Sequence, residues 1–487
     1  MRIASFIPLC VWQAVVLVAS LILGVILEFD KFSGEPRAYG FMGNSVAING
    51  SYAVVGAYYE NDLDGRVYVY RKPHDVWRLH QTLTVSDAGA GDCTLGSAVA
   101  LHGDYMVVGA SNADDKGAAY VFQLDDTVWS LMQKLVDSAG SQYDLFGSSV
   151  AISGTTIAVG APKSDAAANE GGAVVVFLLT SATWTATQKL TASDPSNNAY
   201  FGHRLAMAGA RMAVAASRDD ETVFAGVYMF SSADGITWDE EAKLAPSDAD
   251  PFSYFGSDVA LSEDASFVAV GCPGHDMDVG AVYIYTRTGT TWAQAAKLTA
   301  DYDSRADWDD QMFGWSVAMD GGLMAVGAPY SNARSLLHNG VDVGRVYLFE
   351  QGDGPSWSQT RQMVASDATD SDMIGKNVAI SGTTVISGAV DEDIDGNFNA
   401  GAVYFFRVPG FADMLPSLLA LALGIVVLVL LCLCCAGVCV VGCVVVAAVP
   451  AASLVTVWRR RRSGKVEGKF YPIVHSMPPP DELNETA

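Results

Sequence analysis

The residues best suited to chemistry form a run of oxygen donors near residue 395. Three aspartates and two asparagines stand at every second position of this run: Asp391, Asp393, Asp395, Asn397 and Asn399. Calcium prefers roughly six to eight oxygen ligands, and a glycine such as Gly396 permits the sharp turn of a calcium loop. The glutamate that closes an EF-hand is missing, because Ala402 stands at its position. The spacing therefore predicts a weak calcium site in this segment.

A shorter run of the same kind lies near the start of the chain. It reads Asn61-Asp62-Leu63-Asp64-Gly65 and offers Asp62 and Asp64 as further calcium ligands. Loop aspartates also cap turns and keep a protein surface soluble, so a purely structural explanation is available for acids in loops. Both interpretations are open at the level of the sequence.

The overall composition narrows the classes of function. Asp and Glu total 54 against 29 Lys and Arg, which gives a net charge of −25. Binding to nucleic acid needs clustered cations for the phosphates, so this balance argues against it. Half of the residues are hydrophobic and 17% are charged, which excludes a wholly disordered chain.

One unit is repeated seven times in the middle of the chain. A glycine followed by a run of Val-Ala-Ile type marks each copy, at Gly43, Gly96, Gly147, Gly202, Gly256, Gly314 and Gly375. A Val-Gly-Ala type run and a glycine with an aromatic strand follow in each copy, and six copies add a tryptophan. These short β-branched or aromatic runs, bounded by turn residues, are typical of strands. Each copy therefore predicts four antiparallel strands joined by tight turns.

Copies stacked radially bury the two apolar faces that a single sheet of this kind would expose. The sequence therefore predicts an all-β fold, a seven-bladed β-propeller of four-stranded blades. The seventh copy ends after its third strand, and an open ring would leave an unpaired strand edge. We expect residues 25–33 to supply the missing strand, paired beside Gly401–Phe406.

The landmarks resemble a known repeat. Phe146-Gly147 with Gly160-Ala161-Pro162, and Phe313-Gly314 with Gly327-Ala328-Pro329, resemble the FG-GAP repeat of integrin alpha subunits. The resemblance covers about residues 29–408, with all seven copies in register. It implies a seven-bladed propeller displayed outside the cell, adhesion or ligand recognition, and loops supported by calcium.

The chain departs from that family in two respects. The family's calcium loop lies between the FG and GAP strands, whereas this chain has tight turns there, such as Ser153-Gly154-Thr155. The long domains that separate an integrin propeller from the membrane are also missing, because only residues 407–413 intervene here. The family's calcium sites therefore cannot be transferred, and the sites predicted above lie in other loops.

The predicted topology separates the charges onto one face. In a four-stranded meander, the loops between second and third strands share a face with the loops between blades. Together these loops hold 32 acidic and 5 basic residues, whereas residues 29–413 as a whole hold 49 and 22. We therefore expect an acidic loop face, and an opposite face formed by the short turns.

Two uncharged segments flank the propeller, at residues 3–27 and 414–458, and Arg459–Arg462 follow the second. They predict a signal peptide or signal anchor helix at 1–28 and the propeller at 29–408. A juxtamembrane segment with a C-terminal transmembrane helix then covers 409–458, and 459–487 form a cytoplasmic tail. Two spans would fit the second segment, but the arginines favour single-pass over two-pass topology with the propeller extracellular or lumenal.

These features predict a membrane-embedded propeller that serves in adhesion or binds an extracellular protein or glycan, with calcium as its cofactor. A passive scaffold at the cell surface or an endomembrane is the alternative. An enzyme is disfavoured, because GxSxG and HExxH motifs are missing and the histidines are dispersed. The segment Ser232–Trp238 is one residue short of the Asp-box turn of sialidases, which is structural in any case. The sequence identifies neither the ligand nor a partner subunit.

Overall fold

The computed structural model describes residues 27–34, 38–61, 63–86, 93–216, 226–248, 253–301, 311–334, 339–365 and 367–408. Residues 1–26 and 409–487, which hold the second apolar segment, the tail and nearly all of the first apolar segment, lie outside these ranges. Within the described ranges, no helix has both the length and the apolar character needed to cross a bilayer. The leader, transmembrane and tail assignments therefore stay predictions.

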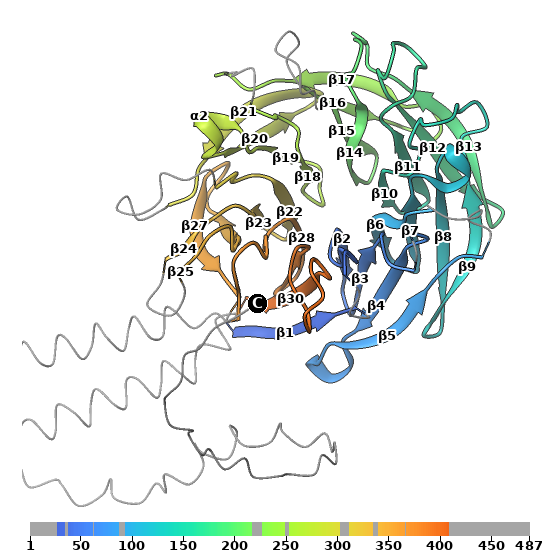
Figure 1. The fold of residues 1–487 in the computed structure, drawn as a ribbon. Coiled ribbons are helices and arrows are strands. Elements are labelled where there is room, and N and C mark those ends of the chain that lie inside the picture. Colours follow the sequence, from blue (N-terminus) through green and yellow to red (C-terminus); the bar gives the residue numbers. More distant parts are fainter. Residues whose placement is uncertain are drawn as a thin grey trace, which may run out of the picture. The chain divides into compact units, whose positions relative to one another are not determined.

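Seven antiparallel four-stranded sheets form a ring, and they are the predicted blades (Figure 1). Blade 1 consists of β2 (Ser45–Asn49), β3 (Tyr52–Ala57), β4 (Arg66–Arg71) and β5 (Arg78–Leu83). Blade 2 consists of β6 (Leu95–His102), β7 (Tyr105–Ala110), β8 (Ala118–Asp125) and β9 (Val128–Leu135). Blade 3 consists of β10 (Ser149–Ser153), β11 (Thr156–Ala161), β12 (Ala173–Thr180) and β13 (Thr183–Leu190).

The remaining blades repeat this order. Blade 4 consists of β14 (Phe201–Ala208), β15 (Arg211–Ala216), β16 (Gly226–Ser231) and β17 (Asp239–Leu244). Blade 5 consists of β18 (Val259–Leu261), β19 (Phe267–Cys272), β20 (Ala281–Thr288) and β21 (Thr291–Leu298). Blade 6 consists of β22 (Ser316–Asp320), β23 (Leu323–Ala328), β26 (Arg345–Gln351) and β27 (Trp357–Met363). Blade 7 consists of β28 (Asn377–Ser381), β29 (Thr384–Ala389), β30 (Ala402–Arg407) and β1 (Leu27–Ser33).

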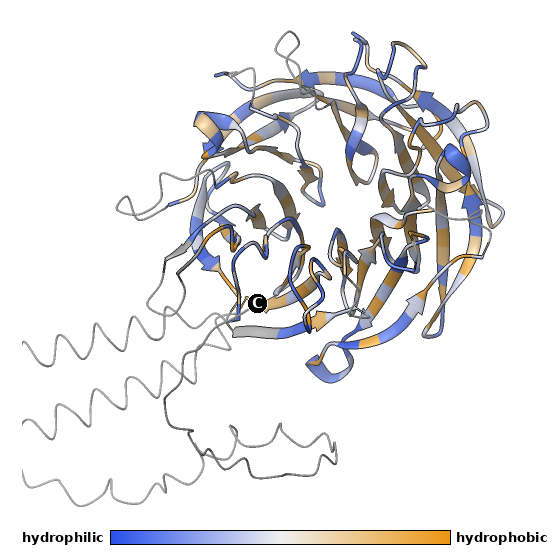
Figure 2. Ribbon diagram, viewed as in Figure 1, coloured by the Kyte–Doolittle hydropathy of each residue, from blue (hydrophilic) through white to orange (hydrophobic). Residues whose placement is uncertain are grey.

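The first strand of each blade lies at the centre of the ring. These strands contact one another in sequence around the centre, and β28 of blade 7 contacts β2 of blade 1. Apolar stretches concentrate on the strands, and the loops are mostly hydrophilic (Figure 2). Clusters of fully buried side chains fill the spaces between adjacent blades, as between blades 1 and 2. The core is thus a series of interfaces between sheets, as the repeat pattern predicts.

The FG and GAP glycines meet across neighbouring blades. If Gly160 of β11 carried a Cβ atom, that atom would lie 2.1 Å from the carbonyl oxygen of Gly202, near the start of the next blade. The same approach closes the ring, because a carbon on Gly388 would lie 2.0 Å from the carbonyl oxygen of Gly43. Only glycine allows two backbones to come this close. The most repeated residues of the sequence are therefore used to pack blade against blade.

Hydrogen bonds reinforce these contacts. The hydroxyl of Ser149 donates to the Gly202 carbonyl at 2.6 Å, and the hydroxyl of Ser316 donates to the Gly375 carbonyl at 2.8 Å. Parallel bridges also link the third strand of one blade to the start of the next, including Met42 to Gly401 between blades 1 and 7. The contact between the last and the first blade is thus built like the others.

The predicted closing strand is confirmed. Strand β1 pairs antiparallel with β30 and completes blade 7, so the first strand of the chain is hydrogen-bonded to its last (Figure 1). Lys31 stands opposite Tyr404 in this pairing, as Lys243 stands opposite Tyr228 in blade 4 and Lys297 opposite Tyr283 in blade 5. The N-terminal strand therefore occupies the register of a fourth strand.

The closing strand also reproduces the side-chain contacts of the other blades. The Lys31 ammonium lies 5.2 Å from the Tyr404 ring centroid and 2.7 Å from an Asp367 carboxylate oxygen. In blade 4, Lys243 lies 5.0 Å from the Tyr228 ring and 2.7 Å from Asp194. Each aspartate lies in the loop that enters its blade, so the lysine joins the outermost strand of a blade to that loop.

Closure brings the two ends of the described chain together. In the β1–β30 pairing, Leu27 stands opposite Arg407. Strand β30 runs from the loop before Gly401 towards the face of the short turns, so both residues lie on the short-turn face. This agrees with the predicted arrangement, in which the acidic loops occupy the other face.

Cys93 and Cys272 are buried, at the entry to blade 2 and in blade 5, and the Cys272 thiol donates to the Ser253 carbonyl at 3.2 Å. Burial raises the pKa of the Cys93 thiol to about 12, so this side chain is un-ionised at neutral pH. Cys272 replaces the alanine of the GAP landmark and packs in the core between blades 4 and 5.

Replacement of Lys31 tests the closing contact. Lys31→Met removes the cation that lies beside Glu392, whose side chain is only 6% exposed. We expect a loss of about 3 kcal/mol in the free energy of unfolding, because a buried carboxylate loses its partner. The matched Lys243→Met removes a pair whose aspartate is 57% exposed and should cost under about 1 kcal/mol. Urea denaturation of the full chain measures both, and equal losses would contradict the closure contact.

Candidate ligand-binding face

The segment predicted to bind calcium forms a folded loop between β29 and β30. The backbone N–H groups of Ile394 and Asn397 each donate to the carbonyl of the other, at 3.1 and 2.9 Å. Between them, Asp395 and Gly396 have φ values of 51° and 80°, the left-handed values of a two-residue hairpin turn. Gly396 therefore serves a hairpin, and the exposed Asp395 stands at its tip.

Two of the predicted carboxylates and one amide converge. The Asn399 side-chain amide donates to an Asp391 oxygen at 3.1 Å, and the backbone N–H of Asn399 donates to Asp393 at 2.9 Å. Asn397 instead donates to the Ile394 carbonyl. The structure thus brings Asp391, Asp393 and Asn399 together and leaves Asp395 and Asn397 to the turn. Three donors are a partial set for calcium, which water and carbonyl groups would have to complete.

The shorter run in blade 1 lies apart from these residues. Asp62 lies outside the described residues. The backbone carbonyl of Asp64 accepts from Leu95 of blade 2, and one buried carboxylate oxygen of Asp64 has no hydrogen-bond partner. The loop therefore faces blade 2. Among the described residues, no group of three or more His, Cys, Asp and Glu side chains is arranged to hold a metal ion.

Glu392, inside the predicted calcium loop, turns towards the core. It is buried and accepts a hydrogen bond from the Tyr404 hydroxyl at 2.9 Å, and Lys31 pairs with its other oxygen. Burial and the charge of Glu392 raise the pKa of the neighbouring Asp372 to about 7. Sequence reasoning missed this cluster, because its members come from three distant segments.

A lysine held by aromatic rings was also missed. Lys376 directly precedes β28, and its ammonium lies 3.8 Å from the ring centroid of Trp315 and 5.4 Å from that of Tyr330. The two rings meet edge to face, with centroids 5.8 Å apart. Burial lowers the pKa of Lys376 to about 8, against the opposing effect of Asp391. Cation–π contact replaces part of the hydration that the ammonium loses.

Further aromatic residues continue from this lysine towards blade 1. Asp391 is charge-coupled to Lys376 and to Tyr58, and burial raises the pKa of Tyr58 to about 12. Tyr58 contacts Tyr59 at 4.4 Å between ring centroids and Phe41 at 6.2 Å. We call this group the aromatic crescent and define it as Tyr39, Phe41, Tyr58, Tyr59, Trp315 and Tyr330. Its members belong to the loop face of blades 6 and 1.

The loop face also exposes apolar side chains. Among the described residues, 9 of the 13 exposed large hydrophobic side chains lie in its loops: Tyr39, Tyr59, Leu63, Val136, Tyr143, Tyr254, Met277, Val341 and Phe398. Phe398 is 63% exposed, and its backbone carbonyl accepts from the N–H of Tyr39, which is 58% exposed. The face therefore exposes aromatic and other apolar groups among its acids, and aromatic side chains are enriched at protein interfaces.

A charged pair lies on the central strands of blades 4 and 5. Arg204 and Asp258 are 3.9 Å apart, and Asp258 accepts from the backbone N–H of Val317 in blade 6. Burial raises the pKa of Asp258 and lowers that of His203 to about 3, so the histidine is neutral at physiological pH. The pair therefore joins three blades.

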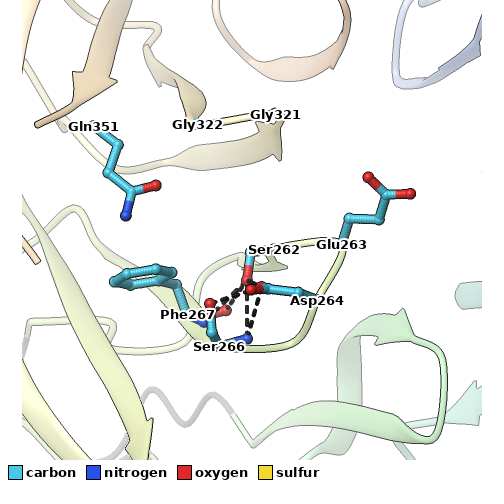
Figure 3. Close-up of a pocket in the computed structure, with 8 residues that line it drawn as sticks. All are labelled: Ser262, Glu263, Asp264, Ser266, Phe267, Gly321, Gly322 and Gln351. Atoms are coloured by element: carbon cyan, nitrogen blue, oxygen red, sulfur yellow. Dashed lines mark hydrogen bonds between the residues drawn. The ribbon is translucent and has the colours of Figure 1, made fainter. Parts of the chain in front are cut away.

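The short-turn face holds a polar pocket of about 550 Å³ between blades 5 and 6 (Figure 3). Its turn residues are satisfied by one another, because Ser262 and Ser266 both donate to Asp264 at 2.7 Å. Asp234, in the segment that is one residue short of an Asp box, likewise accepts from Ile236 and Thr237 at 2.8 Å. These acids stabilise turns, which is the structural explanation given above for loop aspartates.

The comparisons with known proteins agree with the fold. A family model described as the FG-GAP repeat matches residues 35–70, 77–122, 129–177, 184–230, 238–285, 292–349 and 357–406. From the second match onward, each begins at the outermost strand of one blade and ends in the third strand of the next. The repeat is thus offset from the blade by one strand. No curated protein matches the chain.

Several solved structures are similar in outline. A candidate 6-phosphogluconolactonase from Bacteroides uniformis is 11% identical, with a TM-score of 0.47, over 67% of this chain and 86% of that one. Sqt1 from Saccharomyces cerevisiae is 10% identical, with a TM-score of 0.44, over 79% and 100%. A protein from Lactobacillus plantarum is 12% identical, with a TM-score of 0.44, over 67% and 86%. These values support no argument about function.

The raised pKa of Asp372 gives a pH prediction. The folded pKa of about 7 lies above the usual 3.8, so the protonated carboxyl stabilises the fold at low pH. This stability is lost as the pH rises through about 7, with a slope of at most about 1.4 kcal/mol per pH unit. Asp372→Asn mimics the protonated form and should flatten the dependence between about pH 4 and pH 7. Urea denaturation across that range measures it, and an unchanged slope would refute the assignment to Asp372.

Proposed function

The chain belongs to the FG-GAP repeat family, and from this premise we propose that it is a membrane-tethered protein whose loop face serves in adhesion or in the recognition of ligands outside the membrane. The observation that carries the proposal is the pairing of Leu27 with Arg407. The chain enters and leaves the propeller at neighbouring points of the short-turn face. A membrane reached from either point would lie on that side, and the loop face would point away from it.

The sequence beyond these points supports the tether. Residues 3–27 and 414–458 carry no charge, and four arginines follow the second segment. Each segment is long enough to cross a bilayer, and a basic cluster marks the cytoplasmic side of a span. The proposal therefore assigns residues 459–487 to the cytoplasm and the propeller to the outside or the lumen.

The chemistry of the loop face supports binding rather than catalysis. Its acidic excess and its exposed aromatic groups provide a large surface with few cations. The polar groups of the central pair and of the short-turn pocket are engaged in holding blades and turns. A ligand would contact the aromatic crescent and Phe398 together, because aromatic anchors carry much of the energy of protein interfaces.

Cell adhesion tests this proposal directly. Cells that display the full chain are allowed to adhere to immobilised extracellular proteins and glycans. Tyr39→Ser with Phe398→Ser removes two exposed aromatic groups from the loop face and should weaken ligand binding at least about thirtyfold, since each anchor contributes more than about 1 kcal/mol. Ile236→Ser, a control in a short turn where the side chain is 48% exposed, should change nothing. The passive scaffold would be favoured if the wild type, the double variant and Ile236→Ser supported equal adhesion. It would also be favoured if cells without the chain adhered as well as cells that display it.

The calcium site that we propose has fewer ligands than the sequence predicted. We propose that Asp391, Asp393 and Asn399 bind calcium weakly and stiffen the loop that carries Phe398. Calcium should raise the melting temperature of the wild-type chain by a few degrees, because a ligand that binds only the folded state stabilises it.

Matched variants make the calcium test specific. Asp393→Asn removes a converging carboxylate and should abolish the shift, whereas Asp395→Asn at the exposed hairpin tip should keep it. Differential scanning fluorimetry with calcium or magnesium measures the shifts. If calcium does not change the melting temperature of the wild-type chain, the proposed calcium site is wrong. The proposal of a ligand-binding loop face would still stand.

A further inference from the structure

Lys376 occupies a special position in the repeat. The residue that follows the landmark glycine stands at the loop-face end of each central strand. These residues are Asn44, Ser97, Ser148, His203, Ser257, Trp315 and Lys376. Lys376 is the one member of this set that is mainly cationic at neutral pH, because burial keeps His203 neutral. The chain thus places a single ammonium group at this level of the ring, within a strongly acidic face.

The ammonium group of Lys376 has no acceptor. Among the described residues, it forms cation–π contacts with Trp315 and Tyr330 but no hydrogen bond or ion pair. Asp391, the nearest acid by its electrostatic effect, accepts instead from Asn399. An ammonium carries three N–H donors, and the π faces of the rings satisfy its charge but not its hydrogen bonds.

The charges around Lys376 limit the class of ligand that its amine could bind. Arg204 also acts on Lys376, and its own contacts are the His203 carbonyl at 3.2 Å and Asp258 at 3.9 Å. Arg204 is balanced by Asp258, whereas Lys376 has no ion pair among the described residues and can take an anion as its partner. The acids of the surrounding loops repel multiply charged groups, so a single negative charge is tolerated best.

We propose that Lys376 binds a carboxylate that enters the centre of the ring from the loop face. The amine donates to the carboxylate oxygens, while Trp315 and Tyr330 hold it from the other side. This inference rests on the proposed function and specifies its chemistry. The loop face also exposes Tyr39, Tyr59 and Phe398, which offer apolar contacts to a larger ligand. An aspartate or glutamate side chain of a protein ligand therefore fits better than a free acid.

Amine labelling of the full chain in detergent micelles tests the carboxylate site. An acylating reagent modifies exposed amines near neutral pH, and mass spectrometry reports the modification at each lysine. Acetate should protect Lys376 relative to chloride at equal ionic strength, and a peptide with one aspartate should protect it at lower concentrations. Lys116, an exposed lysine elsewhere on the loop face, should show no protection. Equal labelling of Lys376 in all solutions would overturn the inference.

Variants separate this inference from the proposed function. Lys376→Gln keeps the length of the side chain and should weaken binding of the aspartate peptide about tenfold, as expected for loss of a charged hydrogen bond. Lys116→Gln should leave binding unchanged.

The outcomes can be told apart. If acetate protects Lys376 as well as the peptide does, the site takes a free acid and the assignment to a protein ligand is wrong. If Lys376 is not protected but Tyr39→Ser with Phe398→Ser still reduces adhesion, only the carboxylate site fails. If Lys376 is protected but no ligand supports adhesion, only the proposed function fails.

Discussion

The closed ring depends on the antiparallel pairing of β1 with β30, the first and last strands of the described residues. The seventh repeat provides three strands, and without a fourth its edge would present a row of unpaired backbone groups. Strand β1 fills that edge in the same register as the fourth strands of other blades, and Lys31 reaches both Asp367 and Glu392. The strand at the end of the ring is therefore held by a buried charge as well as by backbone hydrogen bonds. Closure in turn places the entry and the exit of the described chain side by side, at Leu27 and Arg407.

We assign different roles to the two faces, structure to one and recognition to the other. Glycines and serines of the repeat are used between blades, where Gly160 meets Gly202 and Ser149 donates across the interface. Acids in the short turns, such as Asp264, are used to hold the turns themselves. The loop face retains exposed groups such as Phe398 and an unmatched amine at Lys376. Phe398 is exposed and the Lys376 amine has no hydrogen-bond partner among the described residues, which is why we assign them to ligand binding.

Much of this fold could be predicted from the sequence, because the landmark residues of each repeat mark the strands of that repeat. The spacing of the landmark glycines gives seven blades, and the missing tryptophan after Phe406 indicates the closing strand. The candidate site could be predicted only in part. Asp391 and Asp393 do converge with Asn399, but Asp395 and Gly396 form a hairpin that the alternation of donors could not distinguish from a calcium loop. Lys376, Trp315 and Tyr330 come from two blades, and no spacing along the chain relates them.

Hydrogen exchange of the full chain tests the closure most directly. Deuterium uptake is followed by mass spectrometry in the peptide that holds residues 27–33 and in the peptide that holds β30. The account predicts that both peptides are protected to the same degree, because the two strands share one ladder of hydrogen bonds. Uptake in residues 27–33 as fast as in an unstructured peptide, with β30 still protected, would show that another segment closes the ring and would contradict the account.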